Sequence, residues 1–225
     1  MSSISPEQIR QALLSVFVLI VSVALHEFGH AFMADRLGDD TPRRQGRVTL
    51  NPIAHADPIG TLLLPLVGGL YGVGFGWGKP VQWQPSRINR KWKMATAQIL
   101  VAIAGPMMNV VLALVTAIVH TILVWRGVIS RGGEASHLIA MAVETNFLLF
   151  FFNLIPAPPL DGGHVAQGFT PYRHREKWDQ IARFGPIIII AVVAIPALAR
   201  IFLVPADWCT DHVYKILFGL VGLPT

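Results

Sequence analysis

Long apolar stretches separated by short polar segments set the pattern of this chain. A helix needs about 20 mostly apolar residues to cross a bilayer. Five stretches reach or nearly reach that length: about 9–37, 59–76, 94–125, 138–156 and 184–204. A shorter apolar tail at 213–223 is too brief to span. The pattern therefore predicts an all-α polytopic membrane protein.

Basic residues gather in three of the connecting segments, 35–58, 79–93 and 159–183. They are Arg36, Arg43, Arg44, Arg47, Lys79, Arg87, Arg90, Lys91, Lys93, Arg173, Arg175, Lys177 and Arg183. By contrast, the connection 126–135 contains only Arg126 and Arg131. Because Lys and Arg are enriched in cytoplasmic loops, we expect the three richest segments to share the cytoplasmic side.

The stretch 59–76 must then enter the membrane and return to the same side. It is rich in glycine, which weakens a continuous helix. Non-helical backbone is tolerated at that depth only against protein or a wet cavity. We therefore expect a glycine-rich re-entrant segment, with a single poorly formed span as the alternative. The alternation from Lys79 to Trp83 predicts a short extended strand region near the interface.

Composition supports the membrane assignment. Apolar residues make up 53% of the 225 residues and charged residues 14%, against about 25% charged in soluble domains. This excludes a soluble globule, and the high hydrophobicity also excludes a disordered chain. The net charge of +5 is explained by the basic loops, so we expect no nucleic-acid partner. Cys209, the single cysteine, can form neither an internal disulfide nor a thiolate zinc cluster.

The first apolar stretch contains a pattern typical of zinc hydrolases, His26-Glu27-Phe28-Gly29-His30. Helical residues four apart lie on one face, so both imidazoles can reach one metal ion. Glu27 lies beside that face, where it can take a proton from water. The pattern directly follows an apolar run over 13–25. Placing ionisable side chains within a membrane costs free energy, so their presence here indicates that they have a function.

Catalytic zinc usually has three protein ligands, so a third is needed. Asp161 is the leading candidate, because it follows an apolar helix that three prolines must end. Gly162 and Gly163 would permit a tight turn that points the carboxylate back into the bundle. An ordinary helix end, with Asp161 as the N-cap of the next helix, is the alternative. His55 and Asp57 are the rival ligands.

Two motifs together resemble the site-2 protease family of intramembrane zinc metalloproteases. They are the segment 26–30 and the N-x-x-P-x-P-x-L-D-G-G sequence of 153–163. The segment 105–109, Gly-Pro-Met-Met-Asn, is similar to a G-P-x-x-N sequence on the family's middle core helix. The resemblance implies one membrane protease domain over 1–225, of the short prokaryotic type without a PDZ or CBS domain. Its three-helix core would cover about 9–37, 94–125 and 138–165, with accessory parts at 59–83 and 184–225.

The resemblance also implies roles for individual residues. His26, His30 and Asp161 would hold one Zn²⁺ per chain, and Glu27 would be the general base. Asn153 would help to hold the scissile peptide or the oxyanion, although a hydrogen bond between helices is an alternative.

Two further polar residues near these motifs need no catalytic role. We expect Asn109 to pack or link helices. We expect His164, where relatives often carry arginine, to be an ordinary loop residue, with a position beside the metal ligands as the alternative.

The implied function is regulated intramembrane proteolysis. The chain would be a zinc endopeptidase that hydrolyses peptide bonds in or near transmembrane segments of membrane-protein substrates. Its partners would be those segments and the lipid bilayer. It would be a multi-pass protein of a prokaryotic inner membrane, with the active site towards the cytoplasm. The alternative is a non-proteolytic metal-binding membrane protein, such as a transporter, sensor or inactive scaffold, which would have no need of Glu27.

Overall fold

The computed structural model describes residues 5–70 and 76–224, and within these ranges the regular structure is helical, with no strand. The α-helices are α1 (Pro6–Arg36), α2 (Thr41–Arg44), α3 (Leu64–Leu70), α4 (Met94–Trp125), α5 (Glu134–Asn153), α6 (Asp161–Phe169), α7 (Arg175–Ala182), α8 (Gly185–Ala194) and α9 (Pro196–Leu220). Short 3₁₀ turns cover Pro52–Ala54, Pro85–Arg87 and Tyr172–His174, and a π-helical turn, Pro58–Leu63, precedes α3.

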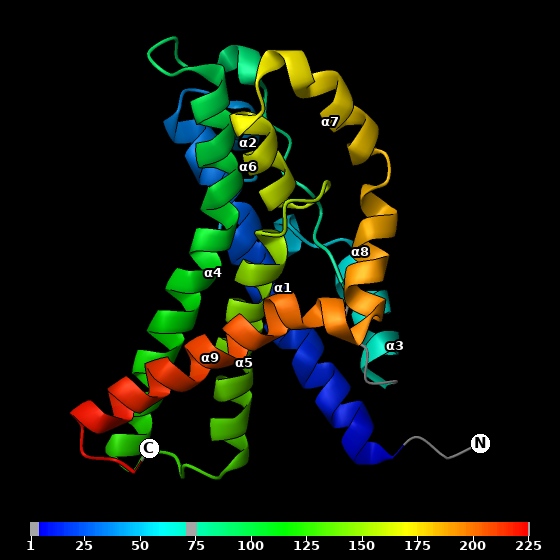
Figure 1. Cartoon of the computed structure of the whole chain (residues 1–225). Coiled ribbons are helices and arrows are strands. Elements are labelled where there is room, and N and C mark those ends of the chain that lie inside the picture. Colours follow the sequence, from blue (N-terminus) through cyan, green and yellow to red (C-terminus); the bar gives the residue numbers. More distant parts are fainter. Residues whose placement is uncertain (1–4, 71–75, 225) are drawn as a thin grey trace.

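Helices α1, α4 and α5 form the frame of the molecule and are each long and apolar enough to cross a membrane. They run along its long axis and spread apart towards one end (Figure 1). Ser5 starts α1 with a capping box, in which its side chain and that of Gln8 satisfy each other's backbone N–H groups. The prediction of a helical fold with several helices long and apolar enough to cross a membrane is confirmed. Helix α4 continues through Pro106 without a break.

The third predicted core segment, 138–165, is not one element. Helix α5 ends at Asn153, and α6 begins at Asp161 after a proline-rich loop. Prolines end the helix, as expected, but Gly162 and Gly163 belong to the first turn of α6 rather than to a tight turn. A Cβ on Gly162 would lie 2.3 Å from the Leu154 carbonyl oxygen. Glycine is needed there because α6 packs closely on the preceding loop.

The predicted stretch 184–204 is also broken. Ile195 is extended (φ −96°, ψ 111°) and separates α8 from α9, whose axes differ by 79°. Pro196 explains the break, because the residue before a proline is disfavoured in helical conformation. Helix α9 then includes most of the apolar tail that the sequence pattern predicted as a separate segment.

Helix α9 lies across α4 and α5 rather than alongside them (Figure 1). Buried His120 of α4 joins the three helices. Its Nδ1 lies 2.7 Å from the Tyr214 hydroxyl of α9, and its Nε2 lies 2.7 Å from the Ser136 hydroxyl of α5. A histidine for which the sequence suggested no role therefore anchors the crossing helix.

The two ends of the glycine-rich stretch lie side by side. The Trp77 N–H donates to the Gly60 carbonyl (3.0 Å), and the Thr61 hydroxyl donates to the Trp77 carbonyl (2.8 Å). Residues 71–75 of the predicted re-entrant segment lie outside the described residues. The segment 79–83 has no strand partner in the described part of the chain, so the predicted strand region is not found there.

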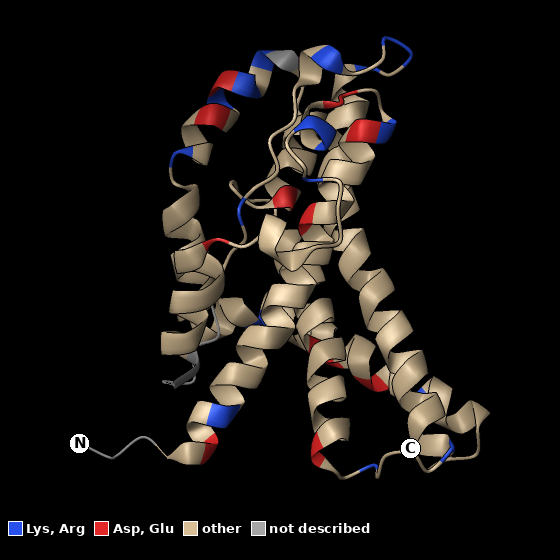
Figure 2. Ribbon diagram, turned by 180° about the vertical axis from the view of Figure 1, so that it is seen from behind, with Lys and Arg blue, Asp and Glu red and all other residues tan. Residues whose placement is uncertain are grey.

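Lys and Arg residues gather at the end of the molecule where α2 and α7 lie (Figure 2). The three basic connections meet there, since α1 ends, α4 begins and α6 leads into α7 at that end (Figure 1). The charge pattern had predicted that these segments share one side.

Candidate metal centre

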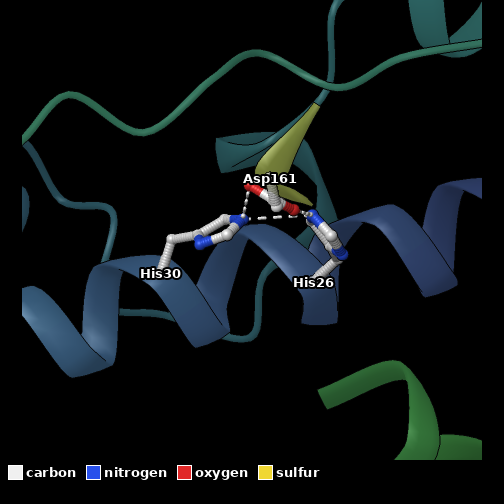
Figure 3. Close-up of side chains that lie close together, drawn as sticks. All are labelled: His26, His30 and Asp161. Carbon is white, nitrogen blue, oxygen red and sulfur yellow. Dashed lines mark hydrogen bonds and ion pairs between the residues drawn. The ribbon is translucent and has the colours of Figure 1, made fainter. Parts of the chain in front are cut away.

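Three side chains converge where α6 approaches α1 (Figure 3). His26 and His30 project from one face of α1, and Asp161 is the first residue of α6. Asp161 Oδ2 lies 3.1 Å from His26 Nε2, and Asp161 Oδ1 lies 3.3 Å from His30 Nε2. The two Nε2 atoms are 3.1 Å apart. Both histidines are buried, and the Asp161 side chain is only 14% exposed.

This geometry fits zinc. Tetrahedral ligands about 2.0–2.1 Å from a zinc ion lie about 3.3 Å from one another, close to the separations found here. Asp161 Oδ2 is buried and receives no hydrogen bond. Two imidazoles and one carboxylate also leave a fourth position open, as catalytic zinc requires. The residues present can therefore hold the ion.

Each histidine is oriented through its other ring nitrogen. His26 Nδ1 lies 2.7 Å from the Asn109 side-chain oxygen, and His30 Nδ1 lies 2.7 Å from the Val101 carbonyl. Both partners are acceptors, so each Nδ1 carries the proton. The Nε2 lone pairs are therefore left to face a metal ion.

Asn109 belongs to a buried polar network that joins three helices. Its amide nitrogen donates to the Ser22 carbonyl of α1 (3.2 Å) and to the Asn146 side-chain oxygen of α5 (2.8 Å). Asn146 in turn donates to the Ser22 hydroxyl (2.9 Å). Asn109 links helices as predicted, but it also contacts a proposed metal ligand. Sequence reasoning missed Ser22 and Asn146, although a polar residue within an apolar helix is the pattern that could have identified them.

Gly105 lets α4 approach the centre. A Cβ at this position would lie 2.2 Å from His30 Nε2 and 2.9 Å from His26 Nε2. Any side chain would therefore displace the imidazoles. The first residue of the Gly-Pro-Met-Met-Asn segment is therefore a glycine for a steric reason, the close approach of α4 to His26 and His30.

Glu27 lies beside the three candidate ligands and is 9% exposed. Its Oε2 accepts a hydrogen bond from the Val81 N–H (2.9 Å), so the segment before α4 orients the carboxylate. Glu27, the three candidate ligands and Asn153 line one cavity of about 710 Å³. This cavity gives water and a substrate room to meet the carboxylate.

Asn153 is the last residue of α5. Its side-chain nitrogen donates to the Leu149 carbonyl of its own helix (2.9 Å). The alternative of a hydrogen bond between helices finds no support in the described part of the chain. His164 lies on α6 rather than in a loop, and it is exposed at the edge of the same cavity.

The rival ligands His55 and Asp57 lie outside the group of three. His55 is fully buried, and its Nε2 lies 2.9 Å from the Thr49 carbonyl. Asp57 caps the turn before α3, where it accepts from the N–H groups of Ile59 and Gly60. Both side chains have structural partners away from the metal centre.

The chain resembles known proteins over most of its length. The model of peptidase family M50 matches residues 14–131 and 120–195. A relative in Bacillus subtilis, YwhC, is 36% identical over 214 residues, which cover 93% of this chain and 92% of that protein. Rip2 of Mycolicibacterium smegmatis is 31% identical over 210 residues, 87% of this chain and 74% of that protein. Both relatives are named for zinc metalloprotease activity. No solved structure matches the chain.

Proposed function

Because this chain belongs to peptidase family M50, we propose that it is an intramembrane zinc endopeptidase. It hydrolyses peptide bonds in or near transmembrane segments of other membrane proteins and holds one Zn²⁺ per chain. The observation that carries the proposal is that Glu27 and the three candidate ligands line one cavity. Helix α1, which supplies Glu27 and both histidines, is long and apolar enough to cross a membrane.

The chain's own residues supply the acid–base chemistry. When bound, zinc supplies Lewis acidity that brings the pKa of a coordinated water towards about 7. Glu27 accepts the proton of the attacking water and later delivers it to the leaving amine. The Val81 N–H orients Glu27 for this transfer.

Asn153 is the proposed contact to the reacting carbonyl. A side-chain amide has two N–H donors, and one of them is bonded to Leu149. The other is left for the scissile carbonyl or the oxyanion that develops on it.

The surroundings of the cavity suggest how a membrane substrate reaches it. The stretch 59–76 is re-entrant in this proposal, which its joined ends support. The segment 79–83 next to Glu27 offers its main chain to an unwound substrate peptide. Because the basic end of the molecule lies near α6 and α7 (Figure 2), the active site faces the cytoplasmic side of the inner membrane.

The test is cleavage of a labelled transmembrane substrate by the purified full chain in proteoliposomes. Glu27→Gln should lower cleavage at least about 100-fold, the usual contribution of a general base, while bound zinc stays near one per chain. Glu176→Gln is the matched control, because Glu176 is exposed on α7 and does not line the cavity. Cleavage by Glu27→Gln near the wild-type rate would contradict the mechanism. A zinc-loaded wild type that cleaves no substrate would favour a metal-binding protein instead.

A further inference from the structure

A carboxylate lies halfway along a membrane-length helix and has no function in the mechanism above. Glu144 is near the middle of α5, which runs from Glu134 to Asn153. In the described part of the chain, its side chain makes neither a hydrogen bond nor an ion pair. Ionisable side chains at such a depth are rare and mark pathways or binding sites, because lipid does not solvate them.

The Glu144 side chain lines a second cavity, of about 490 Å³, between α1, α5, α8 and α9. We call this cavity the side groove. Its walls are largely apolar and include Leu19, Met141, Leu148, Val193, Phe202 and Leu203. Of the described residues that line it, only Glu144 is charged.

The side groove adjoins the cavity of the metal centre. Gly76, Leu149 and Phe152 line both. An elongated apolar ligand with one end at the metal centre can therefore extend into the side groove. A transmembrane segment has the shape and the surface to do so.

The electrostatic surroundings of Glu144 are negative. The charged groups that act on it most are Asp207 and Asp211, both on α9. A cationic side chain entering the side groove would meet a carboxylate that has no other partner. Pairing there would also relieve the cost of carrying that cation through lipid.

From these observations, and resting on the proposed function, we infer that the side groove receives the transmembrane segment of the substrate and that Glu144 selects segments bearing a Lys or Arg. Asn153 lies nine positions after Glu144 on α5, which is about 14 Å at the helical rise of about 1.5 Å per residue. An extended substrate covers that distance in about four residues, and a helical one in about nine. The basic residue therefore lies about four to nine residues from the scissile bond, on the side away from the basic end of the enzyme.

The experiment compares two transmembrane substrates that differ only by Lys or Leu in that window. Wild type in proteoliposomes should cleave the Lys substrate with about tenfold higher kcat/KM, the ratio that one close charge pair can give. Glu144→Gln should reduce the ratio to about one. Glu176→Gln removes an equal charge at an exposed residue of α7 that does not line the side groove, and it should keep the tenfold ratio. Zinc content reports whether each variant is folded.

Binding supplies a readout independent of turnover. In a Glu27→Gln background, Glu144→Gln should weaken the apparent affinity for the labelled Lys peptide about tenfold, whereas Glu144→Lys should prefer a peptide with Glu in its place. Equal cleavage of both substrates by wild type would overturn the inference and leave the protease assignment standing. Equal loss of the ratio in Glu176→Gln would also overturn it, because the general charge of the protein rather than contact with Glu144 would then decide the preference. A wild type that cleaves neither substrate would overturn the proposed function and this inference together.

Discussion

The two zinc-ligand candidates on α1 are supported in different ways. His30 is held by a main-chain carbonyl, that of Val101, whereas His26 is held by the Asn109 side chain. Mutation can therefore remove the support of His26 alone. Asn109→Ala should lower zinc affinity about 10- to 100-fold, as is typical when the partner of a ligating histidine is lost. Titration of the purified protein with a competing chelator measures this.

The control for that experiment is Asn153→Ala, since the hydrogen bond that Asn153 makes among the described residues lies within its own helix. We expect it to keep zinc and to lose cleavage. Zinc affinity unchanged in Asn109→Ala would show that the network only packs the helices together.

At the residue scale, local chemistry was predictable and partners across helices were not. The spacing of His26 and His30 puts both on one face of any helix, so their proximity followed from the sequence. Asp161 could be suggested because prolines end the preceding helix. The contacts made by Asn109 and by the Val81 N–H depend on how α1 packs against α4 and the segment before it. Local pattern contains no information on that packing.

At the element scale, the close approach of α4 depends on one position. Gly105→Ala should abolish zinc binding, because the added Cβ would overlap both imidazoles. Metal analysis of the purified variant, with circular dichroism to confirm helix content, is the measurement. Gly219→Ala in α9 is the matched control, since a Cβ there would meet open space. Gly105→Ala with normal zinc content would mean that α4 can shift without loss of the centre.

The errors in the predicted elements share a physical cause. Apolar runs report which residues avoid water, but they do not report the direction of the helix axis. The stretch 184–204 is apolar except for Arg200, yet the chain turns by 79° at Ile195 and Pro196. Likewise, Gly162 suggested a turn, whereas its small size serves the packing of α6.

At the scale of the whole molecule, the proposed metal ion would connect the first long helix to α6, far along the chain. An ion that binds only the folded state stabilises it by about 2.7 kcal/mol at a free concentration 100 times its Kd. Zinc should therefore raise the thermal midpoint of the full chain, and a chelator should lower it. The thermal midpoint of Asp161→Ala should change with neither zinc nor the chelator. Scanning calorimetry or a thermal-shift assay in detergent measures the midpoint of each protein. An equal response in Asp161→Ala would place the ion elsewhere.

The hydrogen bond between Val81 and Glu27 has a consequence for sequence variation. The donor is a main-chain amide, so every residue type except proline provides it. The shape of the residue at this position can therefore vary without freeing the carboxylate. A saturation library at position 81 should separate two properties. Substrate preference should follow the size of the side chain, and only proline should release the Glu27 carboxylate from its orientation.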